Sequence, residues 1–222
     1  MVILIAAAAL APTVGRAGEQ AVQIGWLSRA VKRTLPLSYL DQPPHDEGIQ
    51  GARLGIADND TTGHFTGQSF TLTETIVSED GDVAAGLREL ASKGIRLVVT
   101  DFPAPELLSV AAMPEVAGIT FFDAGSADDR LRGEDCRANI LHLLPSRAML
   151  ADALVQYLVA KRWQGLLLVV GHGDGDREFA GDVRHAAAKF QARIIQEKPW
   201  TFVPGARRTD TGHFAIQAEV AR

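Results

Sequence analysis

The sequence has 222 residues, of which 46% are hydrophobic and 22% are charged, and its formal net charge is −5. This composition is typical of a globular protein and excludes a disordered chain. A negative net charge without clusters of Lys and Arg argues against nucleic acid as a binding partner. Cys136 is the only cysteine, which excludes an intrachain disulfide and a cysteine-based zinc site.

The first segment is an apolar run over residues 2–11, which has the length of a signal-peptide core and is too short to span a bilayer. Gly15 and Ala17 follow Pro12 and place small residues at the two positions that a signal peptidase recognises. We therefore expect residues 1–17 to be a signal peptide and the mature protein to be soluble in the periplasm. No Lys or Arg precedes the apolar run, so an upstream start, or a buried N-terminal segment of a cytosolic protein, stays open as an alternative.

Short apolar runs then alternate with segments of helical periodicity. The predicted strands cover residues 21–27, 69–77, 95–99, 116–122, 138–144, 166–170 and 192–196. The predicted helices cover residues 48–58, 82–92, 105–112, 146–161 and 176–190, with Ser146 as an N-cap. Short apolar strands separated by helices predict an α/β fold with a doubly wound parallel sheet.

A domain boundary is expected near Leu144 and Pro145, where one set of βα units ends and a second set begins. This gives a complete N-terminal Rossmann-like lobe over residues 18–144 and a partial second lobe over residues 145–222. The second set has too few strands for a complete lobe, although residues 209–222 start another helix-like pattern.

Ligands of open parallel sheets gather at the carboxyl ends of the strands. Polar groups on short loops follow the predicted strands there, next to aromatic residues that could pack on a ligand. The predicted ligand-binding residues at these ends are Trp26, Ser28, Asp101, Phe102, Asp123 and Ser126. For Asp101 and Asp123, capping of the following helix is an equally good interpretation. The sequence has no catalytic or metal-ligand motif, so we expect no enzyme, no metal and no cofactor.

Two segments share features with ligand-binding loops but depart from the motifs. Residues 171–176 lie between a strand and a helix, but their glycine spacing matches no phosphate loop, and two aspartates would repel a phosphate. A nucleotide-dependent enzyme is therefore the weakest hypothesis, and a flexible turn at the rim of a cleft is expected. Residues 58–63 begin like an EF-hand loop, but Ser69 stands where a bidentate Glu is needed, so a turn at a helix end is expected.

Long strings of the sequence resemble the type I periplasmic substrate-binding proteins of ABC transporters. Within that superfamily they are similar to the branch found with PQQ-dependent alcohol dehydrogenase systems. The strings are residues 23–30 (QIGWLSRA), 46–70, 96–104 (RLVVTDFPA), 128–163 and 198–202 (KPWTF). Members of this family continue beyond the position that corresponds to Arg222, so part of the second lobe is expected to be missing.

The resemblance implies two lobes that close around a small molecule in the cleft between them. It implies an extracytoplasmic solute-binding component that works with an ABC transporter permease, near periplasmic alcohol oxidation. By position it assigns Ser28, Asp101 and Ser126 to the ligand, and it places Arg137 and Arg147 near the crossing, where they could meet an anion. The alternative is a periplasmic sensor or partner protein of the same fold that binds a dehydrogenase or a receptor.

Overall fold

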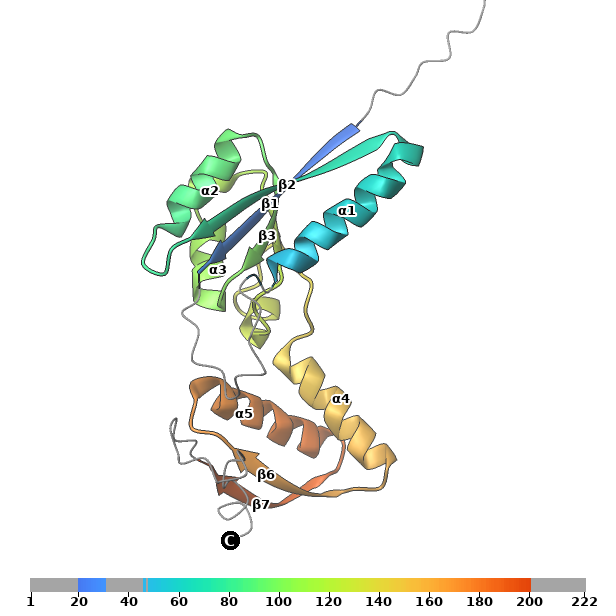
Figure 1. The fold of residues 1–222 in the computed structure, drawn as a ribbon. Coiled ribbons are helices and arrows are strands. Elements are labelled where there is room, and N and C mark those ends of the chain that lie inside the picture. The colour runs from blue at the N-terminus through green and yellow to red at the C-terminus, as the bar shows by residue number, and fades with distance from the viewer. Residues whose placement is uncertain (1–19, 31–45, 47, 201–222) are drawn as a thin grey trace, which may run out of the picture. The chain divides into compact units, whose positions relative to one another are not determined.

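The computed structural model describes residues 20–30, 46 and 48–200 (Figure 1). The predicted signal peptide, residues 1–17, and the helix-like pattern of residues 209–222 lie outside the described residues. The strands are β1 (Gln20–Arg29), β2 (Gln68–Val77), β3 (Leu97–Asp101), β4 (Thr120–Asp123), β5 (Ile140–His142), β6 (Gly165–Val170) and β7 (Arg193–Pro199). The α-helices are α1 (Ile49–Thr66), α2 (Val83–Ser92), α3 (Ala104–Ala111), α4 (Arg147–Ala160) and α5 (Asp174–Lys189).

The strands form two sheets, one with the order β2-β1-β3-β4-β5 and one that contains β6 and β7. The registered pairs β1–β2, β4–β5 and β6–β7 are all parallel. The predicted α/β fold with a parallel sheet is therefore confirmed. The chain divides into two compact units, with Val99 as the last residue of the first and Thr100 as the first residue of the second.

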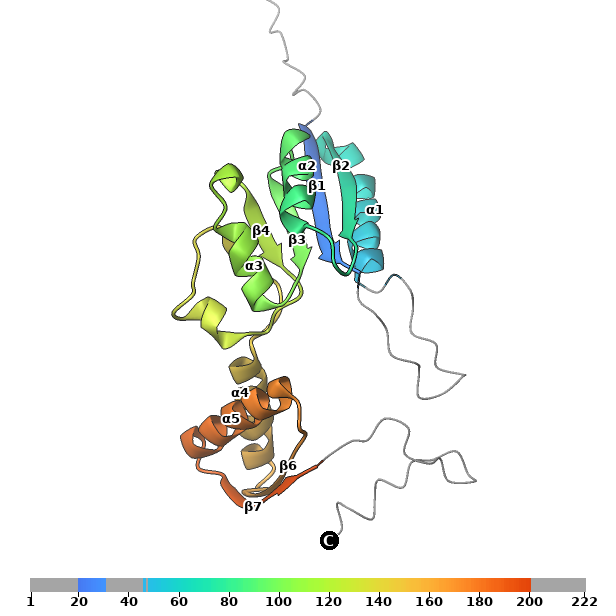
Figure 2. The ribbon, with the colours of Figure 1, turned by 90° about the vertical axis from the view of Figure 1, so that its left-hand side faces the viewer.

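In the first unit, α1 and α2 lie on opposite faces of β1 and β2 (Figure 2). Helix α2 packs closely against β1 at two glycines, since a Cβ on Gly86 would lie 3.1 Å from Leu27 and one on Gly25 would lie 3.1 Å from Leu90. Leu27, Leu87 and Leu90 are fully buried there. On the other face, the Arg53 guanidinium of α1 donates two hydrogen bonds of 2.7 Å to the Glu74 carboxylate of β2. These bonds hold the pKa of Glu74 below its usual value.

Helix α1 is longer than predicted, and the turn expected at residues 58–63 is wrong. The side chains of Asn59, Thr61 and Thr62 donate to backbone carbonyls four residues earlier, which satisfies these polar groups inside the helix. The helix ends at Thr66 and is capped by Gly67, whose φ of 70° is in the left-handed region. Because the segment is helical, it does not form the loop that an EF-hand needs.

The second unit contains β4, β5 and α3, followed by α4, β6, α5 and β7. The predicted N-cap of α4 is confirmed, since the Ser146 hydroxyl accepts a hydrogen bond of 3.3 Å from the backbone N–H of Met149. Helix α5 begins at Asp174, earlier than predicted, because the Asp176 carboxylate accepts from the backbone N–H of Gly173 at 3.1 Å. The glycine-rich segment 171–176 is therefore partly the first turn of a helix. Over the described residues, no helix is both long and apolar enough to cross a membrane.

Candidate functional site

The turn after β4 is organised by Asp123, a fully buried carboxylate. Its Oδ1 accepts hydrogen bonds from the backbone N–H groups of Gly125, at 3.2 Å, and Ser126, at 2.9 Å. Its Oδ2 lies 3.0 Å from Nδ1 of His142, the residue paired with Asp123 in the register of β4 and β5. Asp123 thus caps a turn and contacts a neighbouring strand, rather than capping a helix.

The turn also brings the end of β3 against the end of β4. A Cβ placed on Gly125 would lie 2.4 Å from the backbone nitrogen of Phe102 and 2.6 Å from Oδ1 of Asp101. The backbone N–H of Ala124 donates to the carbonyl of Thr100 at 2.9 Å. Two of the strand ends predicted to share a ligand site are therefore adjacent in the second unit.

The predicted residues at these two ends differ in exposure. Phe102 is 1% exposed, and Ser126 is 5% exposed. The Asp101 side chain is exposed, and the residue that caps α3 is Pro103. Of the predicted residues at these two strand ends, Asp101 is therefore the one whose polar side chain is accessible. Phe102 and Asp123 are buried and hold the backbone of the turn.

Trp26 and Ser28 belong to the first unit. Both side chains are buried, and the indole N–H of Trp26 donates a hydrogen bond of 2.9 Å to the Ser28 hydroxyl. Two positions apart on β1, they project from the same face of the strand. Their polar groups are satisfied by each other in this structure.

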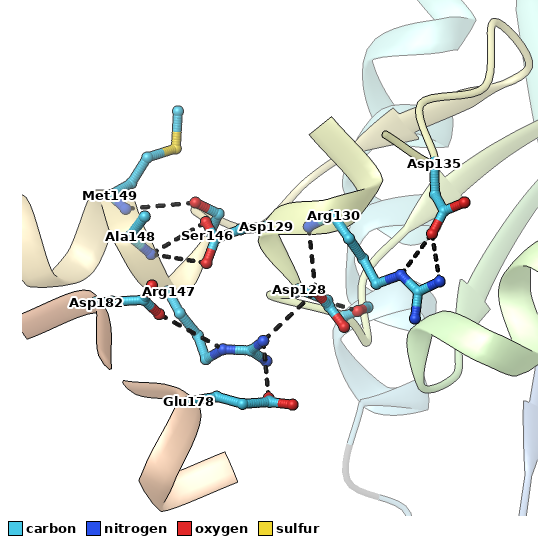
Figure 3. A network of polar contacts seen from close by, with 11 residues as sticks. Asp128, Asp129, Arg130, Asp135, Ser146, Arg147, Ala148, Met149, Glu178 and Asp182 are labelled. Atoms are coloured by element: carbon cyan, nitrogen blue, oxygen red, sulfur yellow. Dashed lines mark hydrogen bonds and ion pairs between the residues drawn. The ribbon is translucent and has the colours of Figure 1, made fainter. Parts of the chain in front are cut away.

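Arg147, at the start of α4, lies among carboxylates from two other segments (Figure 3). Its guanidinium is 2.9 Å from Glu178 and 3.8 Å from Asp182, both on α5, and 3.4 Å from Asp128 in the loop that follows β4. Its Nε is buried without a hydrogen-bond partner. Arg147 therefore links the loop after β4 to α5, and an anionic ligand would compete with these carboxylates for it.

A third aspartate in this network, Asp129, supports the start of α4. Both of its carboxylate oxygens accept from the backbone N–H of Ala148, at 3.1 and 3.2 Å. The pKa of Asp182 is raised, first by burial and then by the negative charge of Asp129, with which it also shares a hydrogen bond. The positive charges of Arg147 and His185 oppose this rise in pKa.

Arg147→Ala is expected to lower the free energy of unfolding by about 2 kcal/mol, because it leaves partly buried carboxylates without their counter-charge. Arg147→Lys should recover part of the loss, since it keeps the charge but not the planar fork of donors. Urea unfolding of the two variants and the parent chain measures these differences. An Arg147→Ala variant within about 0.5 kcal/mol of the parent would contradict a linking role.

The raised pKa of Asp182 predicts a pH-dependent contribution to stability. The folded chain holds this proton more tightly than the unfolded chain, so the contribution is present below the ordinary value of 3.8 and is lost as the pH rises through the folded pKa. Asp182→Asn removes the titration and should gain stability relative to the parent chain as the pH rises over that window. Urea midpoints of both chains at a series of pH values test this, with Asp58→Asn as a control, and parallel curves would contradict it.

A groove of about 460 Å³ lies elsewhere in the second unit, along β6. Its walls are apolar side chains of α4, β6, α5 and β7, such as Leu154 and Phe179, and Trp163 in the turn between α4 and β6. The one acidic side chain in its lining, Asp176, already accepts a hydrogen bond from Gly173. The groove includes none of the predicted ligand residues, and its lining offers little to orient a polar ligand.

Sequence reasoning overlooked His142, Asp129, Glu178 and Asp182 as members of these networks. Two signals were present: His142 lies within a predicted strand, and Glu178 and Asp182 are four residues apart on one face of a predicted helix. Among the described residues, no cluster of His, Cys, Asp and Glu is arranged to hold a metal ion.

Neither a protein-family model nor a curated protein matches the sequence. Solved structures do match the fold. One is a branched-chain amino acid ABC transporter periplasmic ligand-binding protein from Burkholderia xenovorans, with a TM-score of 0.63 and 16% identity over 82% of this chain and 47% of that chain. Another is an ABC transporter substrate-binding protein from Desulfitobacterium hafniense in complex with Leu, with a TM-score of 0.59 and 14% identity over 83% of this chain and 51% of that chain.

A third match is a branched-chain amino acid transporter substrate-binding protein from Streptococcus pneumoniae in complex with isoleucine, with a TM-score of 0.55 and 16% identity over 84% of this chain and 51% of that chain. The chain spans about half the length of each of these structures. At such low identity the likeness concerns the fold. The protein has an α/β fold with a parallel sheet, like that of the type I periplasmic binding proteins.

Proposed function

We propose that this protein is the solute-binding component of an ABC transporter and that it binds a small molecule at the carboxyl ends of β3 and β4. The observation that carries the proposal is the fold, which is shared with ABC transporter binding proteins, two of them in complex with an amino acid. The adjacent strand ends in the second unit support it, because open parallel sheets bind ligands at that edge. The protein would act by binding and release, without catalysis.

Within the proposed site, Asp101 is the residue expected to contact the ligand directly, since its carboxylate is exposed at the end of β3. Asp123 and Ser126 would hold the turn after β4 next to Asp101, and the buried side chain of Phe102 would pack under this turn. Trp26 and Ser28 at the end of β1 remain predicted ligand residues. Arg147 would contact an anionic ligand only after exchange with Glu178 or Asp182.

Thermal-shift and calorimetric titration of the chain with leucine, isoleucine, other amino acids, small carboxylates, alcohols and PQQ tests the proposal. A ligand at about 100 times its Kd should stabilise the folded chain by about 2.7 kcal/mol. Asp101→Ala should abolish the shift, while Asp58→Ala, an exposed acidic residue on α1, should leave it unchanged. No shift with any compound in the panel would contradict the proposal.

The cellular setting is a further part of the proposal and rests on the sequence resemblance. We infer an exported protein that delivers its ligand to a permease and serves a system of PQQ-dependent alcohol oxidation. Affinity capture from periplasm and membrane extracts tests this setting. Recovery of a permease supports it, and recovery of a dehydrogenase or receptor without a permease would favour the sensor or partner role instead.

A further inference from the structure

Among the predicted ligand residues at the ends of β3 and β4, the accessible side chain is a hydrogen-bond acceptor. Asp101 is exposed at the end of β3. A Cβ on Gly125 would lie 2.6 Å from its Oδ1, so this carboxylate lies against the turn after β4. An ionised carboxylate accepts hydrogen bonds at about four sites and donates none. Asp101 can therefore take a donor of a ligand in addition to its contacts within the protein.

The backbone donors of that turn are already used. Successive N–H groups in a turn can form a binding site for an anion. Here the N–H groups of Gly125 and Ser126 donate to Oδ1 of Asp123, at 3.2 and 2.9 Å. The N–H of Ala124 donates to the carbonyl of Thr100 at 2.9 Å. A carboxylate or phosphate of a ligand would have to displace these partners to reach the N–H groups.

The remaining oxygen of Asp123 also acts as an acceptor. Its Oδ2 lies 3.0 Å from Nδ1 of His142, and the Asp123 side chain is fully buried. A carboxylate that accepts from the two backbone N–H groups and from a protonated Nδ1 satisfies all of these groups at once. Asp123 then places a negative charge within the turn. Such a charge favours a cation over an anion at the same strand ends.

Arg147, the cation that the sequence places near this edge, does not offset the acidic groups. Its guanidinium lies 3.4 Å from Asp128, in the loop that continues from the turn, and 2.9 Å from Glu178. It is also 3.8 Å from Asp182. Because these carboxylates already surround its one positive charge, Arg147 offers little attraction to an anionic ligand. The acceptors at the strand ends therefore determine which charge the site favours.

We propose that the ligand group bound at the ends of β3 and β4 is a protonated amine that donates to the Asp101 carboxylate, and that this edge does not bind a carboxylate or a phosphate. The inference rests on the proposed function and gives the chemical class of the group that is recognised. An ammonium group has only donors, so it is the complement of an accessible carboxylate. Its hydrogen bonds to a carboxylate are charge-assisted and about twice as strong as neutral ones.

Calorimetric titration of the chain with matched pairs of probes tests the inference. The two members of a pair have the same number of carbon atoms and carry either amines or carboxylates. The pairs are isopentylamine with isovalerate, benzylamine with benzoate, and putrescine with succinate. In at least one pair the amine should bind with a Kd about tenfold or more below that of the acid, because only the amine can donate to Asp101.

Variants of Asp101 show whether this carboxylate is the group that recognises the amine. Asp101→Asn keeps the size of the side chain and removes its charge, so it should raise the Kd of the bound amine by about tenfold or more. Asp101→Glu keeps the charge and should retain the preference for the amine. Asp58→Asn, which removes an exposed carboxylate on α1, should leave the Kd unchanged. Urea unfolding of each variant establishes that the fold is kept.

Acids that bind as tightly as their matched amines would overturn the inference, although the binding itself would support the proposed function. Amine binding that Asp101→Asn does not weaken would overturn it as well. If no amine of the pairs bound, the inference would fail. The proposed function would fail with it only if the full panel of amino acids, carboxylates, alcohols and PQQ also gave no shift.

Discussion

Replacing Asp123 with Ala is expected to lower the free energy of unfolding by about 4 kcal/mol. The substitution removes an acceptor that serves the backbone N–H groups of Gly125 and Ser126 and the ring of His142. The site is buried, so water cannot replace the lost bonds without rearrangement. The turn after β4 should open, and any ligand that depends on it should no longer bind.

Asp123→Asn is the matched control for this prediction. Its amide oxygen can accept from the same two backbone groups, and its amide nitrogen can donate to His142 when the facing ring nitrogen is unprotonated. We expect a loss of about 1–2 kcal/mol, well below that of the alanine variant. Urea unfolding at about pH 7 measures both losses, with the exposed Asp58→Ala as reference. If Asp123→Ala proved as stable as Asp58→Ala, Asp123 would not be what holds the turn.

Apolar periodicity was sufficient to predict the order of the elements, because burial selects the residue types of a strand or helix locally. The run from Leu166 to Val170 and the amphipathic face of Val83, Leu87 and Leu90 correspond to β6 and α2 in the structure. The end of α1 was missed, because Asn59, Thr61 and Thr62 are residues typical of turns. Their hydrogen bonds back to the helix become visible only in three dimensions.

The sequence predicted which strand ends carry the candidate site residues, but it did not predict which of these residues contact one another. A polar residue after an apolar strand, such as Asp101 or Asp123, identifies a strand end without specifying its neighbours. The contact between Asp123 and His142 depends on the register of β4 with β5, and that of Arg147 with Glu178 depends on which helices pack together. Both are properties of the tertiary fold, which periodicity along one segment does not encode.

Gly125→Ala is expected to destabilise the chain by about 3 kcal/mol, because the added methyl group meets atoms that cannot move aside freely. The new Cβ would lie 2.4 Å from the backbone nitrogen of Phe102 and 2.8 Å from the backbone carbon of Asp101. Relief requires a shift of the connection between β3 and α3, and Phe102, buried in the core, resists that shift. The variant should therefore disturb the two strand ends that form the proposed ligand site.

Two further variants separate this steric effect from a general effect of replacing glycine. Gly181→Ala, on α5, has no neighbour within 4 Å of the new Cβ and should be neutral or stabilising by up to about 1 kcal/mol. The double variant Gly125→Ala, Asp101→Ala removes the carboxylate oxygen that lies 2.6 Å away but keeps the backbone contacts, so it should not recover the lost stability. Urea midpoints of the variants decide the matter. Full recovery in the double variant would mean that the Asp101 side chain alone opposes the methyl group, and that the two strand ends are held together less tightly than their backbone distances indicate.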